Sequence, residues 1–141
     1  MRFLLDTNVV SEWTKARPHS GVVAWLAAAD EDRIFISVIT IAELRHGVER
    51  LPGGTRRERL DHWLTEDLPL RFEERLLVVD AETANEWGRV MARGQAAGRP
   101  PATMDAFIAA TVLQHDMVLV TRNVADFAPL GLKLVNPWSN G

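Results

Sequence analysis

Cysteine and tyrosine are both absent from this chain of 141 residues. Without cysteine there can be no disulfide bond, no thiolate nucleophile and no thiolate metal site, so a reducing compartment is permitted and oxygen ligands for a metal remain possible. The amino terminus also lacks a basic segment followed by a long apolar run. We therefore expect no signal peptide and a cytoplasmic protein.

A strong positive charge is missing as well. The formal net charge is -3 at pH 7 and the isoelectric point is about 5.8, which disfavours the broad positive field of a high-affinity duplex binder. Any contact with nucleic acid must therefore be local or metal-mediated. One basic cluster, residues 56–59, is interleaved by Glu58 and Asp61 and is predicted to be a solvated face rather than a binding patch.

Apolar runs alternate with helical patterns along the whole chain. Strands are predicted at residues 3–5, 34–36, 76–79, 117–120 and 132–135, and helices at 9–15, 20–30, 38–50, from 55 onward, from 80 onward and at 103–114. Hydrophobic residues make up 47% and charged residues 25%, as in ordinary globular proteins. The sequence predicts one domain, residues 1–141, with a mostly parallel sheet of four to five strands and helices on both faces, a three-layer α/β/α fold.

Four carboxylates lie at strand ends or in the first turns of predicted helices: Asp6, Glu43, Asp105 and Asp126. Asp6 follows a buried run at the carboxyl edge of the sheet, where open α/β sheets bind ligands, but it could equally cap the next helix. Burying an isolated carboxylate costs free energy, and neighbouring carboxylates raise each other's pKa. Several acids that lie close together therefore generally require a cation. Oxygen ligands favour Mg²⁺ or Mn²⁺.

Four segments together resemble the PIN-domain ribonucleases. They are Leu4-Leu5-Asp6-Thr7-Asn8, the helix 37–47 that contains Glu43, the stretch 105–111, and Leu119-Val-Thr-Arg-Asn-Val-Ala-Asp-Phe127. The resemblance is to VapC and FitB-like toxins of type II toxin–antitoxin modules in particular, and the four segments occur in the family's order. It implies a PIN-like fold and an endoribonuclease that depends on Mg²⁺ or Mn²⁺.

The resemblance also implies roles for individual residues. Asp6 and Asp105 match direct metal ligands, and Glu43 matches an acid that acts through water or as a base. Asp126 is our choice for the fourth acid, a ligand directly or through water, although some relatives carry an aspartate where this chain has Asn123. The residues expected to support the acids are Thr7, Asn8, Thr121 and Asn123. The residues expected to offset the negative charge beside RNA are Arg45, Arg99 and Arg122.

The implied partners are an RNA substrate, a cognate antitoxin and a second copy of the chain. Five tryptophans and several apolar helix positions favour a homodimer, because they exceed what one small core needs. Residues 9–29 and 38–50 are the expected contact surfaces. We expect the antitoxin to lay an apolar helix or tail there and to place an arginine among the acids.

Three alternative interpretations were considered. Asp6-Thr-Asn8 partly resembles the first motif of haloacid dehalogenase-like phosphatases, but that motif needs a second aspartate where Asn8 stands. Glu43 and His46 have the Glu-x-x-His spacing of di-iron helices, which use two copies where this chain has one. A PIN-like module that binds RNA or a partner without cutting it stays open, although the intact acids weigh against it.

Overall fold

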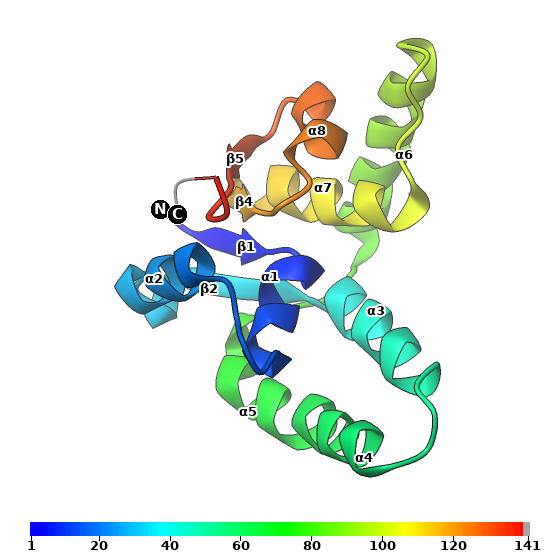
Figure 1. Cartoon of the computed structure of the whole chain (residues 1–141). Helices are drawn as coiled ribbons and strands as arrows, with labels where there is room; N and C mark the ends of the chain where they lie inside the picture. The colour runs from blue at the N-terminus through cyan, green and yellow to red at the C-terminus, as the bar shows by residue number, and fades with distance from the viewer. Residues whose placement is uncertain (140–141) are drawn as a thin grey trace.

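The computed structural model describes residues 1–139, and its centre is one parallel sheet of five short strands (Figure 1). The strands are β1 (Phe3–Leu5), β2 (Ile34–Ser37), β3 (Leu76–Leu77), β4 (Val118–Val120) and β5 (Lys133–Val135). Their spatial order is β3-β2-β1-β4-β5, and every pair is parallel. The predicted sheet is therefore confirmed. β1 lies in the middle, so the residue after it, Asp6, is placed at the centre of the carboxyl edge.

Eight α-helices surround the sheet in the described part of the chain. They are α1 (Thr7–Ser11), α2 (Ser20–Ala28), α3 (Val38–Glu49), α4 (Thr55–His62), α5 (Leu68–Phe72), α6 (Ala81–Ala96), α7 (Thr103–His115) and α8 (Val124–Phe127). Each of the six predicted helices is present, whereas α5 and α8 were not predicted. Short 3₁₀ turns cover residues 12–14, 31–33, 73–75 and 128–130. No helix within residues 1–139 is long and apolar enough to cross a membrane.

Side chains at the helix starts fix where two of the longer helices begin. The Ser37 hydroxyl accepts a hydrogen bond from the Ile39 N–H at 3.0 Å and so caps α3. Asp80 and Thr83 form a capping box at the start of α6. Because both caps directly follow apolar runs, the chain turns from strand to helix at the same edge of the sheet.

The two faces of the sheet are covered by different helices. Leu5 and Val120 belong to one buried cluster with α1, α2, α4 and α5, while Leu4 and Leu119 belong to another with α7. This division follows from strand geometry, since successive side chains point to opposite faces. Helix α6 packs on the outside of α7 (Figure 1). The result is a three-layer α/β/α arrangement, as the sequence predicts.

A single π-helical turn, Trp63–Asp67, joins α4 to α5. Pro69 accounts for it, because proline has no N–H to donate and its ring would clash with the carbonyl four residues earlier in a regular helix. The Leu68 N–H instead bonds to the carbonyl oxygen of Trp63, five residues back. The wider turn keeps Leu64 and Leu68 buried against the sheet.

Candidate active site

Asp6 is buried between the end of β1 and the start of α1, with 5% of its surface exposed. One carboxylate oxygen accepts a hydrogen bond from the Thr7 N–H at 2.9 Å, and the other accepts one from the Thr121 hydroxyl at 2.7 Å. Asp6 is therefore a helix cap as well as a candidate site residue. Burial raises the pKa of Asp6 above its ordinary value, and these two donors only partly oppose that effect.

Thr121 reaches Asp6 because β1 and β4 are parallel neighbours whose carboxyl ends meet. The Thr121 hydroxyl both donates and accepts, since it also accepts a hydrogen bond from the Asn123 N–H at 2.9 Å. The Asn8 side-chain amide lies 3.4 Å from both Asp6 and Thr121, at the long end for a hydrogen bond. The predicted supporting residues of the first and fourth segments thus form one network.

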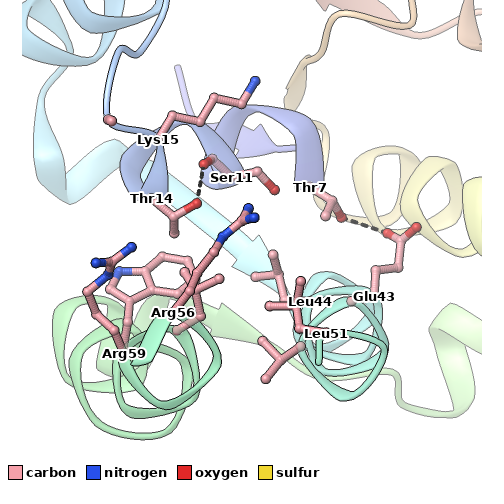
Figure 2. A pocket seen from close by; sticks show the side chains of 14 residues that line it. Thr7, Ser11, Thr14, Lys15, Glu43, Leu44, Leu51, Arg56 and Arg59 are labelled. Atoms are coloured by element: carbon pink, nitrogen blue, oxygen red, sulfur yellow. Dashed lines mark hydrogen bonds between the residues drawn. The ribbon is translucent and has the colours of Figure 1, made fainter. Parts of the chain in front are cut away.

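Glu43 faces this network from the second turn of α3. Its carboxylate accepts a hydrogen bond of 2.6 Å from the Thr7 hydroxyl, shown as a dashed line in Figure 2. The Thr7 hydroxyl also lies 3.3 Å from that of Thr40, which is buried one turn before Glu43 on the same helix. Sequence reasoning missed Thr40, although its spacing of three from Glu43 puts both on one helix face.

Asp105 is partly buried in the first turn of α7. Its pKa is raised from 3.8 to about 6, first by burial and then by the negative charges of Asp6, Asp126 and Glu43. A helix N-terminus stabilises a nearby carboxylate and so lowers its pKa, which is opposite to the direction found for Asp105. Burial and repulsion therefore outweigh the helix dipole at Asp105, and the other three acids lie close enough to act on its carboxylate.

Asp126 and Asn123 were the two candidates for the fourth position. Asp126 is exposed in the first turn of α8, and its charge raises the pKa of both Asp6 and Asp105. Asn123 is neutral and contacts the network through its backbone N–H. The fourth negative charge beside the site is therefore that of Asp126, and its part in catalysis stays a prediction.

The three predicted RNA-binding arginines lie in different surroundings. Arg45 donates to Asp61 at 2.6 Å and lies 3.4 Å from Glu49, and these contacts raise its pKa. Arg122 stacks its guanidinium over Trp138, 5.6 Å from the ring centre. Arg99 lines a hollow of about 360 Å³ together with Asp105 and Asp126. Of the three, Arg99 is the one that shares a surface hollow with the acids.

The donor atoms at this edge suit a hard divalent cation, because they are all carboxylate, hydroxyl or amide oxygens. Within residues 1–139, no three acidic or histidine side chains form a ready-made metal cage. Mg²⁺ does not need one, since it usually binds one or two carboxylates and keeps several waters or substrate phosphates. The mutual repulsion that raises the pKa of Asp105 is the kind that a cation relieves. The residues therefore fit Mg²⁺ or Mn²⁺.

We expect Thr121→Val to lower the free energy of unfolding by about 1–3 kcal/mol, because the buried Asp6 carboxylate loses its shortest hydrogen bond. Urea unfolding at pH 7 in EDTA measures the change. Thr121→Ser is the control, since it keeps the hydroxyl and should lose much less. Equal stability of the valine and serine variants would show that this hydrogen bond does not hold Asp6.

A model of the PIN domain family matches residues 3–128. The chain belongs to the PIN-domain family. This PIN domain is 35% identical to the VapC ribonuclease Y4jK of Sinorhizobium fredii, over 96% of each chain. It is also 35% identical to toxin FitB of Neisseria gonorrhoeae, over 96% of this chain and 97% of FitB. A chain in the crystal structure of FitAcB from the same organism superposes with a TM-score of 0.90 at 34% identity, covering 96% of this chain and 98% of that one.

The fold and the family predicted from the sequence are thereby confirmed. The family match begins at the first residue of β1 and extends through α8, so all four segments that carry the resemblance lie within it. In this PIN domain the same segments supply Asp6, Glu43, Asp105 and Asp126 from four different elements.

Proposed function

We propose that this PIN domain is a divalent-metal-dependent endoribonuclease and the toxin of a type II toxin–antitoxin module. The observation that carries the proposal is that Asp105 on α7 lies near acids from the start of α1, from α3 and from α8, whose charges together with burial raise its pKa to about 6. Such a cluster lowers the stability of the folded protein when no cation is bound. It lies at the carboxyl edge of the sheet, where α/β proteins bind ligands. The similarity to a VapC ribonuclease and to toxin FitB supports RNA as the substrate.

In this proposal Asp6 and Asp105 hold Mg²⁺ or Mn²⁺ directly, and Glu43 and Asp126 contact it directly or through water. When bound, the metal makes a water easier to deprotonate and offsets the charge of the phosphoryl group. The chain has neither cysteine nor tyrosine to serve as a covalent nucleophile, which is consistent with attack by water. Water is the attacking group.

The protein residues orient this chemistry. Thr121 and the Thr7 N–H hold the two oxygens of Asp6 in a fixed direction. The Thr7 hydroxyl donates a hydrogen bond to Glu43 and so fixes the direction of a carboxylate that can accept a proton from the attacking water. Both threonines therefore position an acid rather than touch the substrate.

The partners that we propose are RNA, a cognate antitoxin and a second copy of the chain. The antitoxin would contact the α1–α2 and α3 surfaces with an apolar segment and bring an arginine to the surplus negative charge of the acids. Val23 on α2 is 47% exposed and Leu70 on α5 is 71% exposed, which leaves apolar surface for a partner. Sedimentation at micromolar concentration showing only monomer would contradict the homodimer.

A cleavage assay tests the proposed function. Purified protein, freed of any partner, is incubated with total RNA in EDTA, Mg²⁺ or Mn²⁺. We expect cleavage only with metal, and we expect Asp6→Asn to abolish it while Asp32→Asn does not. Asp32 is a suitable control because it is exposed in the turn before β2, at the opposite edge of the sheet. Cleavage without metal would contradict the metal-dependent mechanism, and no cleavage in any condition would favour the silent RNA- or partner-binding module.

A further inference from the structure

A groove of about 580 Å³ opens directly beside the acids, between α1 with the turn after it, α3 and α4 (Figure 2). Thr7 and Glu43, which are joined by a hydrogen bond, form the end nearest the acids. Arg56 and Arg59 extend from α4 toward the segment Ser11–Lys15 on the far wall, as Figure 2 shows. The groove therefore leads from a negatively charged end to a positively charged wall.

Arg56 and Arg59 have no acidic partner within 4 Å among residues 1–139, in contrast to most arginines near them. Lys15, also at the groove, pairs with Glu12. Arg57, between the two free arginines in sequence, pairs with Glu49 at 3.1 Å. The two free guanidinium groups are thus available for an anionic ligand.

The basic and acidic residues that alternate along the sequence of α4 lie on different sides of the helix. Arg56 and Arg59 share the groove with Leu60 and Trp63, a spacing of three, four and seven residues from Arg56 that marks one helix face. Glu58 and Asp61 line a different hollow, with Arg57. Arg56 and Arg59 are exposed to solvent, as predicted for this basic cluster, and they also form one wall of the groove. Acids that interleave them in sequence lie on another side of the helix.

The floor of the groove is apolar and includes Leu44, Leu51 and Trp63. A cationic wall above an apolar, partly aromatic floor suits single-stranded nucleic acid, whose phosphates need cations and whose bases stack on flat apolar surfaces. An apolar peptide on the α1 and α3 sides of the groove would leave Arg56 and Arg59 on α4 without an anionic partner, whereas RNA phosphates would pair them. The net charge of -3 agrees with a local contact rather than a broad one.

The geometry points to a single-stranded RNA track in this groove, with Arg56 and Arg59 contacting backbone phosphates next to the scissile bond and Trp63 offering a surface to a base. This inference rests on the proposed ribonuclease function, because the acids define where the scissile bond lies. The two arginines bind the substrate and take no part in the chemical step. They act on substrate binding, and they also reduce the repulsion between RNA and the four acids.

The test is binding of a fluorescein-labelled, mixed-sequence single-stranded RNA to the cleavage-deficient Asp105→Asn protein in Mg²⁺, followed by anisotropy at several salt concentrations. Adding Arg56→Gln and Arg59→Gln together should weaken binding about tenfold and reduce the slope of log affinity against log salt by about 1.4, or 0.7 for each phosphate contact. Arg57→Gln is the matched control. It removes one positive charge from the same helix, where the double variant removes two, and because Glu49 already neutralises Arg57 it should change affinity less than about twofold.

Cleavage kinetics in the otherwise unaltered protein give a second readout. The Arg56→Gln/Arg59→Gln protein should show a raised KM with little change in kcat. Arg57→Gln should leave both KM and kcat unchanged. Equal losses for the Arg57 variant and the double variant would overturn the RNA track, since the effect would then be general charge. Unchanged RNA binding together with lost antitoxin binding would assign the groove to the protein partner. If the unaltered protein does not cut RNA, the ribonuclease proposal fails in the cleavage assay while the binding comparison still decides the track.

Discussion

Replacing Asp105 by asparagine is expected to stabilise the metal-free protein by about 0.5–2 kcal/mol and to reduce RNA cleavage at least about 100-fold. The carboxylate is partly buried beside Asp6, Asp126 and Glu43, which together with burial raise its pKa to about 6. The full shift corresponds to about 3 kcal/mol, and partial exposure reduces this through solvent screening. Burial and charge account for the raised pKa of Asp105 with no contribution from a hydrogen bond within residues 1–139, so replacing its carboxylate by an amide should break few contacts.

The gain should depend on pH in a defined direction. The folded-state pKa of Asp105 lies above the value of 3.8 for the unfolded chain, so folding favours the protonated form. Below about pH 4 the carboxyl is neutral in both states and costs nothing. As the pH rises from about 4 to about 6, the metal-free protein should therefore lose stability from this group, and above that window the loss should stay constant. Asp105→Asn should lack this part of the profile.

Thermal and urea unfolding in EDTA and in Mn²⁺, across that pH range, measures both effects. Mn²⁺ should raise the melting temperature of the unaltered protein with increasing concentration and that of Asp105→Asn much less, because the ion binds the folded state preferentially. Asp32→Asn removes the same charge far from the cluster and should leave the profile unchanged. A less stable Asp105→Asn protein in EDTA, with no metal effect on either protein, would mean that the acids do not form one site.

Asp6→Asn is expected to behave differently, although it should abolish cleavage equally. Both Asp6 oxygens accept hydrogen bonds, from the Thr7 N–H and from the Thr121 hydroxyl. An asparagine would turn an N–H₂ group toward one of these donors. The relief of repulsion is then offset by a lost hydrogen bond, so Asp105→Asn is the clearer test of repulsion.

The second large effect is expected at Gly94, which allows the loop carrying Arg99 to pack against α6. A methyl group at Gly94 would lie 2.5 Å from Cδ of Pro101 and 2.9 Å from the carbonyl oxygen of Arg99. The Arg99 N–H also bonds to the Gly94 carbonyl oxygen at 2.8 Å. Gly94→Ala must therefore displace this loop, and we expect it to lower the free energy of unfolding by about 1–3 kcal/mol.

Cleavage should fall in the same variant, because the displaced loop leads into α7 and Asp105. Gly88 provides the control on the same helix, since nothing lies within 4 Å of a methyl group placed there. Gly88→Ala should raise stability by up to about 1 kcal/mol through helix propensity and leave cleavage unchanged. Urea unfolding measures the stability of the Gly94→Ala and Gly88→Ala proteins, and the RNA assay measures their cleavage. Similar behaviour of the two variants would show that the close packing at Gly94 is not what places the loop.

Local chemistry was sufficient to predict most elements of this fold. The apolar runs at residues 3–5 and 34–36 form strands because they are short and uninterrupted, and Ser37 and Asp80 begin helices because their side chains satisfy free backbone N–H groups. Helix α5 could not be predicted in the same way. It depends on a π turn that accommodates Pro69, and the packing of Leu64 and Leu68 against the sheet decides that turn.

The sequence alone determined the identity of the acids and the family, since Asp6, Glu43 and Asp105 stand in recognisable segments. Only the tertiary structure decided which groups affect one another. It placed the Thr121 hydroxyl on Asp6, 115 residues away, and separated Arg45, bound to Asp61, from the free Arg56 and Arg59. The physical reason is that hydrogen bonds, repulsion and ion pairing depend on distance in space. A linear pattern gives residue types and helix faces, and strand order and helix packing set those distances.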